Sequence, residues 1–267
     1  LILRLLQGAG VRIIELPFTA QGGLDLMLLE QLLINEPVQL ALLSSGVSLP
    51  SGIALANPDR MQLVRLLNRH GCWLLENDSY GELGFEQPIS PLRDLANPER
   101  LMVFSTFEKM LGPEAPFGYL LSRHLSSELQ RQFLLRAFCL SPIRQRAIAR
   151  LYQSGRIDQH LRDLRPQLKE QARLMSLRLD EHLGDQVTYR MPAAGATFWL
   201  RSRAAVDMRL VFQRLLGRQV VIAPGELFSI SGLHCQHLRL SHTFDGAHNL
   251  GSALGDLALA LKQAQTE

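Results

Sequence analysis

An acid, a phenol and a lysine follow two apolar segments of this sequence, close to the points where the segments end. Asp78 and Tyr80 come directly after the run CWLLE, and Lys109 lies three residues beyond the run RLMVFST. In an open parallel sheet, ligands bind outside the carboxyl ends of the strands. These side chains are therefore candidates for a ligand site. From spacing alone, a surface lysine whose stem lies on apolar neighbours is the more ordinary explanation of Lys109.

Lysine is rare in this chain, which makes each lysine worth locating. Of the 28 basic residues only Lys109, Lys169 and Lys262 are lysines, and the rest are arginines. The last two lysines fall on polar faces of predicted helices, so only Lys109 stands beyond a buried strand. The net charge of +3 comes from scattered residues that form no block able to grip nucleic acid by itself.

The elements that would position these residues alternate short apolar runs with helical patterns. Predicted strands cover residues 11–17, 38–43, 72–76 and 100–106, and predicted helices cover residues 24–34 and 57–71. Continuous apolar strands interleaved with helices are typical of a mostly parallel sheet. The predicted fold class is therefore α/β, with helices on both faces of that sheet.

The helix predicted at residues 57–71 carries the clearest end signals. Asn57 is the expected N-cap, Pro58 fits the first helical position and Gly71 ends the helix. Its expected buried stripe consists of Met61, Leu63, Val64, Leu66 and Leu67.

From about residue 141 the pattern changes to that of a smaller α+β unit. Helices are predicted at residues 143–155, 165–184 and 206–217, and strands at residues 186–191, 196–201, 220–224 and 237–242. A final helix is expected to begin near Ala247. One face of the second helix holds Leu168, Ala172, Met175, Leu179 and Leu183. The predicted boundary near residue 155 gives domains 1–155 and 156–267, the second including a linking helix.

Cysteine usage and hydropathy exclude several classes of protein. Three widely spaced cysteines are typical of reduced thiols in a cytoplasmic protein. Cys235 lies between His234 and His237, but adjacent strand residues point to opposite faces, so no metal is expected there. No run of eighteen apolar residues occurs, so no membrane span is expected. The first residues lack the layout of a signal peptide, and the chain is interpreted as cut upstream.

Several motifs follow one another in a fixed order along nearly the whole chain. They are SLPSG (48–52), RLLNRHGCWLLENDSYGEL (65–83), RLMVFSTFEKMLGPEAPFGYL (100–120), GRIDQHLRDLR (155–165), APGELFS (223–229) and HLRLSHTF (237–244). In type and separation they resemble the motifs of fold-type I, pyridoxal-phosphate-dependent aminotransferases. The closest likeness is to the effector domains of MocR-type (GntR-family) transcription regulators. The resemblance makes residues 1–155 the large cofactor-binding domain, with its N-terminal part missing.

The resemblance implies a role for each candidate residue. Lys109 matches the catalytic lysine, whose primary amine condenses with the cofactor aldehyde and later moves the substrate proton. Asp78 matches the carboxylate that pairs with the pyridinium nitrogen, and Tyr80 the phenol that hydrogen-bonds the ring oxygen. Thr106 matches a hydroxyl donor to the cofactor phosphate. Arg239 matches the arginine that holds a substrate α-carboxylate by a bidentate pair.

The departures from the family pattern concern the cofactor phosphate. The family's phosphate-binding arginine falls on Pro116, and acids stand at Glu108 and Glu114 where the family has a serine and a glycine. A charge-assisted hydrogen bond to phosphate is worth about 1.5–3 kcal/mol, so binding of pyridoxal 5'-phosphate is expected to be weak.

Three functions stay open at this point. The first is an effector and oligomerisation domain that binds pyridoxal phosphate, forms a homodimer and responds to a small-molecule effector or amino acid. Such a domain would contact DNA only through an N-terminal domain absent from this chain. The second is a working aminotransferase for an amino acid, and the third is a degenerate scaffold without cofactor.

Overall fold

The computed structural model describes residues 2–17, 19, 23–44, 47–48, 50–137, 140–243 and 249–265. Residue contacts divide the chain into two compact units. The parallel-sheet unit comprises residues 25–48 and 54–167, and the antiparallel-sheet unit comprises residues 1–24, 49–53 and 168–267. This division by contacts falls between Gln167 and Leu168, whereas the domain boundary near residue 155 stays a prediction.

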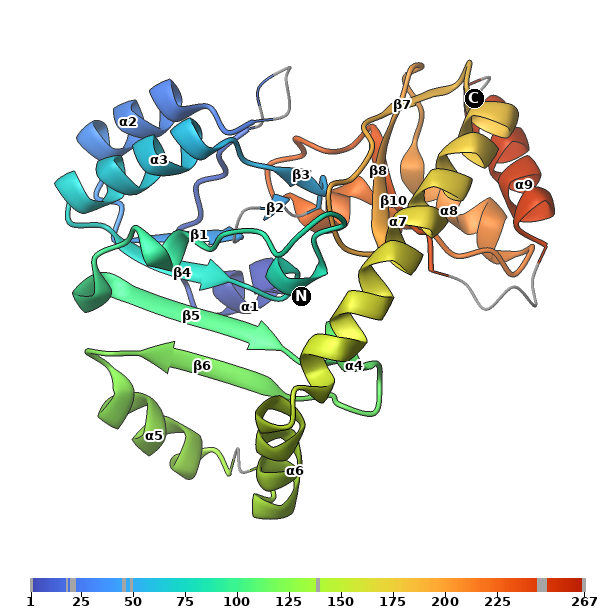
Figure 1. The fold of residues 1–267 in the computed structure, drawn as a ribbon. Coiled ribbons are helices and arrows are strands. Elements are labelled where there is room, and N and C mark those ends of the chain that lie inside the picture. Colours follow the sequence, from blue (N-terminus) through green and yellow to red (C-terminus); the bar gives the residue numbers. More distant parts are fainter. Residues whose placement is uncertain are drawn as a thin grey trace. The chain divides into compact units, whose positions relative to one another are not determined.

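Four strands form the sheet of the parallel-sheet unit, in the order β1-β4-β5-β6 (Figure 1). They are β1 (Leu40–Ser44), β4 (Trp73–Asn77), β5 (Leu101–Thr106) and β6 (Gly118–Ser122). The first three run parallel, and β6 is antiparallel to β5. The prediction of a mostly parallel α/β sheet is confirmed.

Helices and short turns connect these strands. The helices are α2 (Leu26–Asn35), α3 (Asn57–Arg69), α4 (Glu108–Leu111), α5 (Ser126–Leu135) and α6 (Pro142–Gln153). Single turns of 3₁₀ helix are η1 (Gly81–Leu83), η2 (Leu92–Asp94) and η3 (Pro98–Arg100), and the short strands are β2 (Val47–Ser48) and β3 (Ile53–Ala54). Figure 1 shows α2 and α3 side by side next to β1, and α5 beside β6 at the other side of the sheet.

Helix α3 differs from its prediction at two positions. The helix begins at Asn57, so Ala56 takes the N-cap position, and the Asn57 side chain instead accepts a hydrogen bond from Arg60 at 2.9 Å. Met61 is 44% exposed, so its predicted place in the buried stripe is wrong. Arg60 is buried instead, because its guanidinium also donates to the Pro91 carbonyl at 2.9 Å.

The prediction of a strand at residues 11–17 is wrong. None of these residues belongs to a strand. A strand needs a hydrogen-bonded neighbour, and local apolarity cannot supply one. Glu15 instead binds the loop at residues 229–231, accepting from the Ser229 hydroxyl at 2.6 Å and from the Ile230 amide at 2.5 Å.

The antiparallel-sheet unit is an α+β unit, as predicted. Its sheet has the order β7-β8-β10-β9, formed by β7 (Val187–Tyr189), β8 (Thr197–Ser202), β10 (His237–Ser241) and β9 (Ala223–Pro224). Its helices include α1 (Ile2–Gly8), α8 (Met208–Leu216), η4 (Gly225–Phe228) and α9 (Leu250–Gln263). The predicted start of the last helix, Ala247, lies outside the described residues.

Helix α7 (Arg156–Leu183) is one continuous helix of 28 residues with Pro166 inside it. A proline inside a helix removes one hydrogen bond and costs about 3 kcal/mol, so burial of the helix must offset that cost. The predicted stripe supplies this burial, since every member is at most 6% exposed: Leu168, Ala172, Met175, Leu179 and Leu183. Across the described residues, no helix is both long and apolar enough to cross a membrane.

Candidate functional site

The carboxyl edge of the parallel sheet carries four of the five predicted site residues. Asp78 and Tyr80 follow β4, Thr106 ends β5, and Lys109 lies in α4 directly after β5. All four belong to the parallel-sheet unit. Arg239 lies on β10 of the other unit and is described there by itself.

Asp78 is buried and already bound to a cation. Its Oδ2 accepts a hydrogen bond from Nη1 of Arg93 at 2.5 Å, and the same guanidinium nitrogen lies 3.8 Å from Oε2 of Glu76. Glu76 is completely buried on β4 and also accepts from the backbone amides of Leu92 at 2.5 Å and of Arg93 at 3.1 Å. The sequence gives no signal for Arg93, because no local spacing rule links a turn residue to an acid fifteen positions earlier.

The acids of this cluster stabilise the positive charge of Arg93. Burial alone would lower the pKa of Arg93, but the hydrogen bond and charge of Asp78, together with the charge of Glu76, raise it above its ordinary value. The guanidinium therefore stays charged and neutralises one of the two acids.

The backbone around Asp78 is fixed as closely as its side chain. The Asp78 amide donates to the Phe104 carbonyl at 2.8 Å, and its carbonyl accepts from the Ser105 hydroxyl at 3.2 Å. A Cβ atom at Gly81 would overlap Oδ1 of Asp78, so any other residue there would have to displace the Asp78 carboxylate. Asp78 is therefore held from several sides.

The strand register places the predicted site residues on two different faces of the sheet. Asn77 pairs with Phe104 on β5, and Thr106 lies two residues further along that strand, so all three point to one face. Glu76 pairs with Val103 on the opposite face, and Asp78 joins Glu76 there through Arg93. The structure does not bring the carboxylate of Asp78 to the face of Thr106.

Thr106 and Lys109 flank the start of α4. The Thr106 hydroxyl accepts from the Glu108 amide at 3.3 Å and donates to the Phe117 carbonyl at 3.3 Å. Nζ of Lys109 lies 3.3 Å from Oε1 of Glu108, and 37% of the lysine side chain is exposed. The amine is therefore accessible and has a neighbouring acid.

Aromatic residues fill the other side of α4. Phe107 contacts Phe117, Tyr119 and Tyr152 at ring-centroid distances of 5.9, 5.8 and 6.2 Å. Burial raises the pKa of Tyr152 to about 12, with further contributions from Tyr119 and nearby acids. Burial and the charge of Asp78 also raise the pKa of Tyr119. Both phenols are thus neutral hydrogen donors at pH 7. Tyr80 is half-buried at the N-cap of η1.

Arg239 is held by an aromatic cluster in the antiparallel-sheet unit. Its neighbours Leu238 and Leu240 are buried, and its guanidinium lies 4.8 Å from the centroid of the Phe228 ring. Trp199, its partner in the strand register, stacks on His237 at 5.1 Å. This geometry is suited to a cation–π contact that orients the guanidinium.

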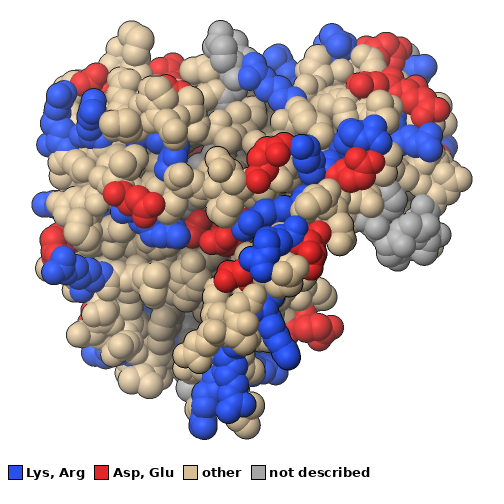
Figure 2. Space-filling model, viewed as in Figure 1, with Lys and Arg blue, Asp and Glu red and all other residues tan. Residues whose placement is uncertain are grey.

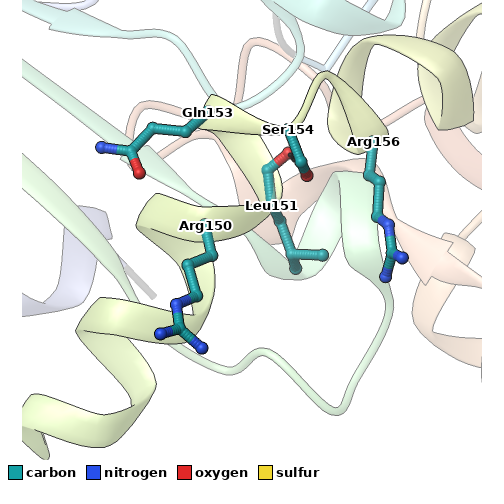
Figure 3. Close-up of a pocket in the computed structure, with 5 residues that line it drawn as sticks. All are labelled: Arg150, Leu151, Gln153, Ser154 and Arg156. Carbon is teal, nitrogen blue, oxygen red and sulfur yellow. Dashed lines mark hydrogen bonds between the residues drawn. The ribbon is translucent and has the colours of Figure 1, made fainter.

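A shallow depression of about 480 Å³ lies where α6 ends and α7 begins. Figure 3 shows the side chains of Arg150 and Arg156 extending on either side of Leu151, with Ser154 and Gln153 completing the lining. Basic residues, in blue, are interspersed with tan residues over α6 in Figure 2. The residues that line the depression are largely exposed, so it is a solvated surface feature.

The two histidines near Cys235 pack against each other. The rings of His234 and His237 are 5.3 Å apart and Cys235 is exposed. In the part of the chain that the structure describes, no group of three or more potential ligands gathers.

Fold and lysine loop together define a domain of the aminotransferase type. The family model "Aminotransferase class I and II" matches residues 2–247, and the chain belongs to that family. The "Uncharacterized HTH-type transcriptional regulator YjiR" of Escherichia coli K12 is 24% identical over 264 residues, which cover 98% of this chain and 56% of that protein. YisV of Bacillus subtilis, with the same description, is 26% identical over 98% of this chain and 52% of that protein.

Solved structures with the same fold include aminotransferases. LysN, an α-aminoadipate aminotransferase from Thermus thermophilus complexed with N-(5'-phosphopyridoxyl)-L-leucine, gives a TM-score of 0.86 at 25% identity, covering 96% of this chain and 67% of that one. A multiple-substrate aminotransferase from Thermococcus profundus gives 0.84 at 21% identity, covering 95% and 64%. The chain spans about half the length of the curated relatives it matches. It is an aminotransferase-like domain similar to HTH-type transcriptional regulators.

The residues present fit a pyridoxal-type cofactor only at the end of the site that holds Lys109. The accessible amine of Lys109 suits an aldehyde, whereas the Thr106 hydroxyl already donates to the Phe117 carbonyl and would have to release it before donating to a phosphate oxygen. The carboxylate of Asp78 is occupied by Arg93 on the other face of the sheet, and Pro116 offers no cation.

Proposed function

We propose that this chain is the ligand-binding and dimer-forming domain of a transcriptional regulator, and that it holds pyridoxal 5'-phosphate through Lys109. One observation supports this proposal above others: the acid expected to activate the cofactor ring is bound to Arg93. A site that has a covalent anchor but no acid at the ring nitrogen is suited to holding a ligand rather than to rapid turnover. Contact with DNA would belong to a separate domain.

Each site residue has a role in this proposal. The Lys109 amine would hold the cofactor aldehyde covalently, with release of water, and the cofactor when bound would supply an electron-accepting ring. Thr106 donates to the phosphate once its hydroxyl turns away from the Phe117 carbonyl, and Tyr80 donates to the ring oxygen. Arg239 holds the carboxylate of an amino acid or related effector, since its guanidinium can make a bidentate pair. Because Pro116 cannot pair with a phosphate, the affinity for the cofactor is low.

A working aminotransferase is the second candidate. The likeness to LysN and the retained Arg239 on β10 favour it. Amino-group transfer from a panel of amino acids to 2-oxo acids would distinguish the two candidates, because the regulator proposal expects turnover near background.

Titration with pyridoxal 5'-phosphate tests the covalent anchor. Parent protein, Lys109→Ala and the control Lys262→Ala would each be incubated with cofactor, reduced with borohydride and mapped by mass spectrometry. We expect an adduct on residue 109 in the parent and in the control, and none in Lys109→Ala. Equal labelling of all three proteins at other lysines would remove the proposal and leave a scaffold without cofactor.

The homodimer is a separate part of the proposal. The relatives with this fold are expected to complete each cofactor site with residues of the partner, so the dimer should form without ligand. Light scattering at micromolar concentration checks this expectation, and a monomer would contradict it.

A further inference from the structure

We propose that Asn77, rather than Asp78, faces the ring nitrogen of a pyridoxal-type ligand in this domain, so the site presents a neutral amide there. The inference rests on the proposed function and deepens it. It concerns which side chain meets the ligand and in which charge state.

The register of the sheet places Asn77 on the ligand face. Asn77 pairs with Phe104, and Thr106 is two residues further along β5 on the same face. Strand geometry puts the Cα atoms of Asn77 and Thr106 about 8 Å apart. One pyridine ring with a phosphomethyl arm can bridge such a span from an amide at one end to a hydroxyl at the other.

The same register points Asp78 away from that face. Its carboxylate lies with Glu76, because Arg93 binds both acids, Asp78 at 2.5 Å and Glu76 at 3.8 Å. Its other oxygen lies against Gly81, where a Cβ would overlap it. Turning Asp78 toward Thr106 would break the bond to Arg93 and leave that guanidinium to Glu76.

Lys109 belongs on the side of Asn77. Within α4, Phe107 and Met110 are buried, and Phe107 contacts Tyr119, which pairs with Ser105 on the face of Glu76. Glu108 and Lys109 form the exposed side of the same short helix. The amine therefore lies away from the aromatic cluster.

The amide of Asn77 is oriented to donate. Its Oδ1 accepts from the Ser79 hydroxyl at 2.7 Å and from the Ser79 amide at 3.1 Å. With the oxygen held by Ser79, the NH₂ group is the end that can meet a ligand. An NH₂ group donates to an unprotonated pyridine nitrogen, whereas a carboxylate accepts from a protonated one. The ligand ring would therefore be held neutral and would be a weaker electron acceptor.

Three variants test this assignment with pyridoxal 5'-phosphate carrying ¹⁵N in the ring. In the parent, the ¹⁵N resonance should report an unprotonated nitrogen. Asn77→Asp should bind about tenfold more tightly and shift the resonance to that of a protonated ring, because a charged hydrogen bond replaces a neutral one. Asn77→Ala should bind several-fold more weakly with the resonance unchanged.

Asp78→Asn separates the two candidate partners. Its dissociation constant should stay within about twofold of the parent's and its ¹⁵N resonance should not shift, while its urea midpoint falls. If instead the parent ring is protonated, or Asp78→Asn weakens binding tenfold while Asn77→Asp changes nothing, the inference is overturned but the proposed function stands. Should Asp78→Asn not fold, the two Asn77 variants decide alone. If the parent protein forms no adduct at Lys109, both the inference and the proposed function are wrong.

Discussion

Replacing Arg93 by alanine tests how the acid cluster of β4 is held. The change removes a hydrogen bond of 2.5 Å to Asp78 and an ion-pair contact with the completely buried Glu76. A hydrogen bond to a charged group contributes about 1.5–3 kcal/mol, and breaking a fully buried ion pair costs about 3–5 kcal/mol. Since 32% of the Arg93 side chain is exposed, solvent screens part of this loss. We expect the free energy of unfolding to fall by about 2–3 kcal/mol.

The assay is urea unfolding followed by circular dichroism at several pH values. In Arg93→Ala two acids lose the cation that they share, and protonating either acid relieves their repulsion. The folded variant therefore takes up protons more readily than its unfolded chain, so its deficit relative to the parent should shrink as pH falls from 7 toward 4. Arg93→Lys keeps the charge but loses the planar fork, and we expect a loss of about 1 kcal/mol.

Arg123→Ala is the matched control, because Arg123 makes an exposed ion pair with Glu99 at 3.4 Å. Exposed pairs contribute about 0–1 kcal/mol, so this variant should unfold close to the parent. The reasoning is refuted if Arg93→Ala is no less stable than Arg123→Ala, or if its deficit does not change with pH.

Other predictions concern packing and pH. Gly118→Ala should cost at least about 2 kcal/mol, since a Cβ there would overlap the Ser105 carbonyl, whereas Gly255→Ala in α9 meets open space and should stabilise by about 0.5–1 kcal/mol; urea unfolding checks both. Leu179→Ala should cost about 2–5 kcal/mol in the same assay, because Leu179 is fully buried in α7. Burial lowers the pKa of His242 to about 4. Between pH 6.5 and 4 this histidine is therefore protonated in the unfolded chain and neutral in the folded chain. As the pH is lowered from 6.5 to 4, the free energy of unfolding should therefore fall by about 1.4 kcal/mol per pH unit. Thermal unfolding at several pH values checks this, and His242→Gln should lack this contribution to the pH dependence.

Features that repeat along the sequence were predictable from it. The stripe of α7 was identified because its members recur at helical spacing along the helix, and all of them are buried. Apolar runs separated by helices were sufficient to predict a mostly parallel sheet, and β1, β4 and β5 pair in parallel. In these elements the local pattern and the final packing agree.

Features that depend on distant partners were not predictable. Residues 11–17 have the composition of a strand but lie in none of the three sheets, because pairing is decided by neighbours elsewhere in the chain. The bond between Arg93 and Asp78 could not be anticipated either. Strand alternation predicts that Asn77 and Asp78 point to opposite faces of the sheet. Which of them shares a face with Thr106 depends on the register with β5.

Charge separates a sensor from a turnover enzyme on this scaffold. The amine of Lys109 lies beside Glu108, the acid of Asp78 is bound to Arg93, and Pro116 supplies no cation. Each of these features removes a charge that a transaminase would direct at its cofactor. Under the proposed function, the ligand would therefore be held by one covalent bond and by neutral hydrogen bonds. A ligand shifts a conformational equilibrium only by its difference in affinity for the two states, and weak, reversible contacts let that difference respond to concentration. A tighter contact at residue 77, as in Asn77→Asp, should therefore make the domain saturate at a lower cofactor concentration. This would narrow the range of cofactor concentrations to which the domain responds. The protonated ring would at the same time be a stronger electron acceptor, as an enzyme requires.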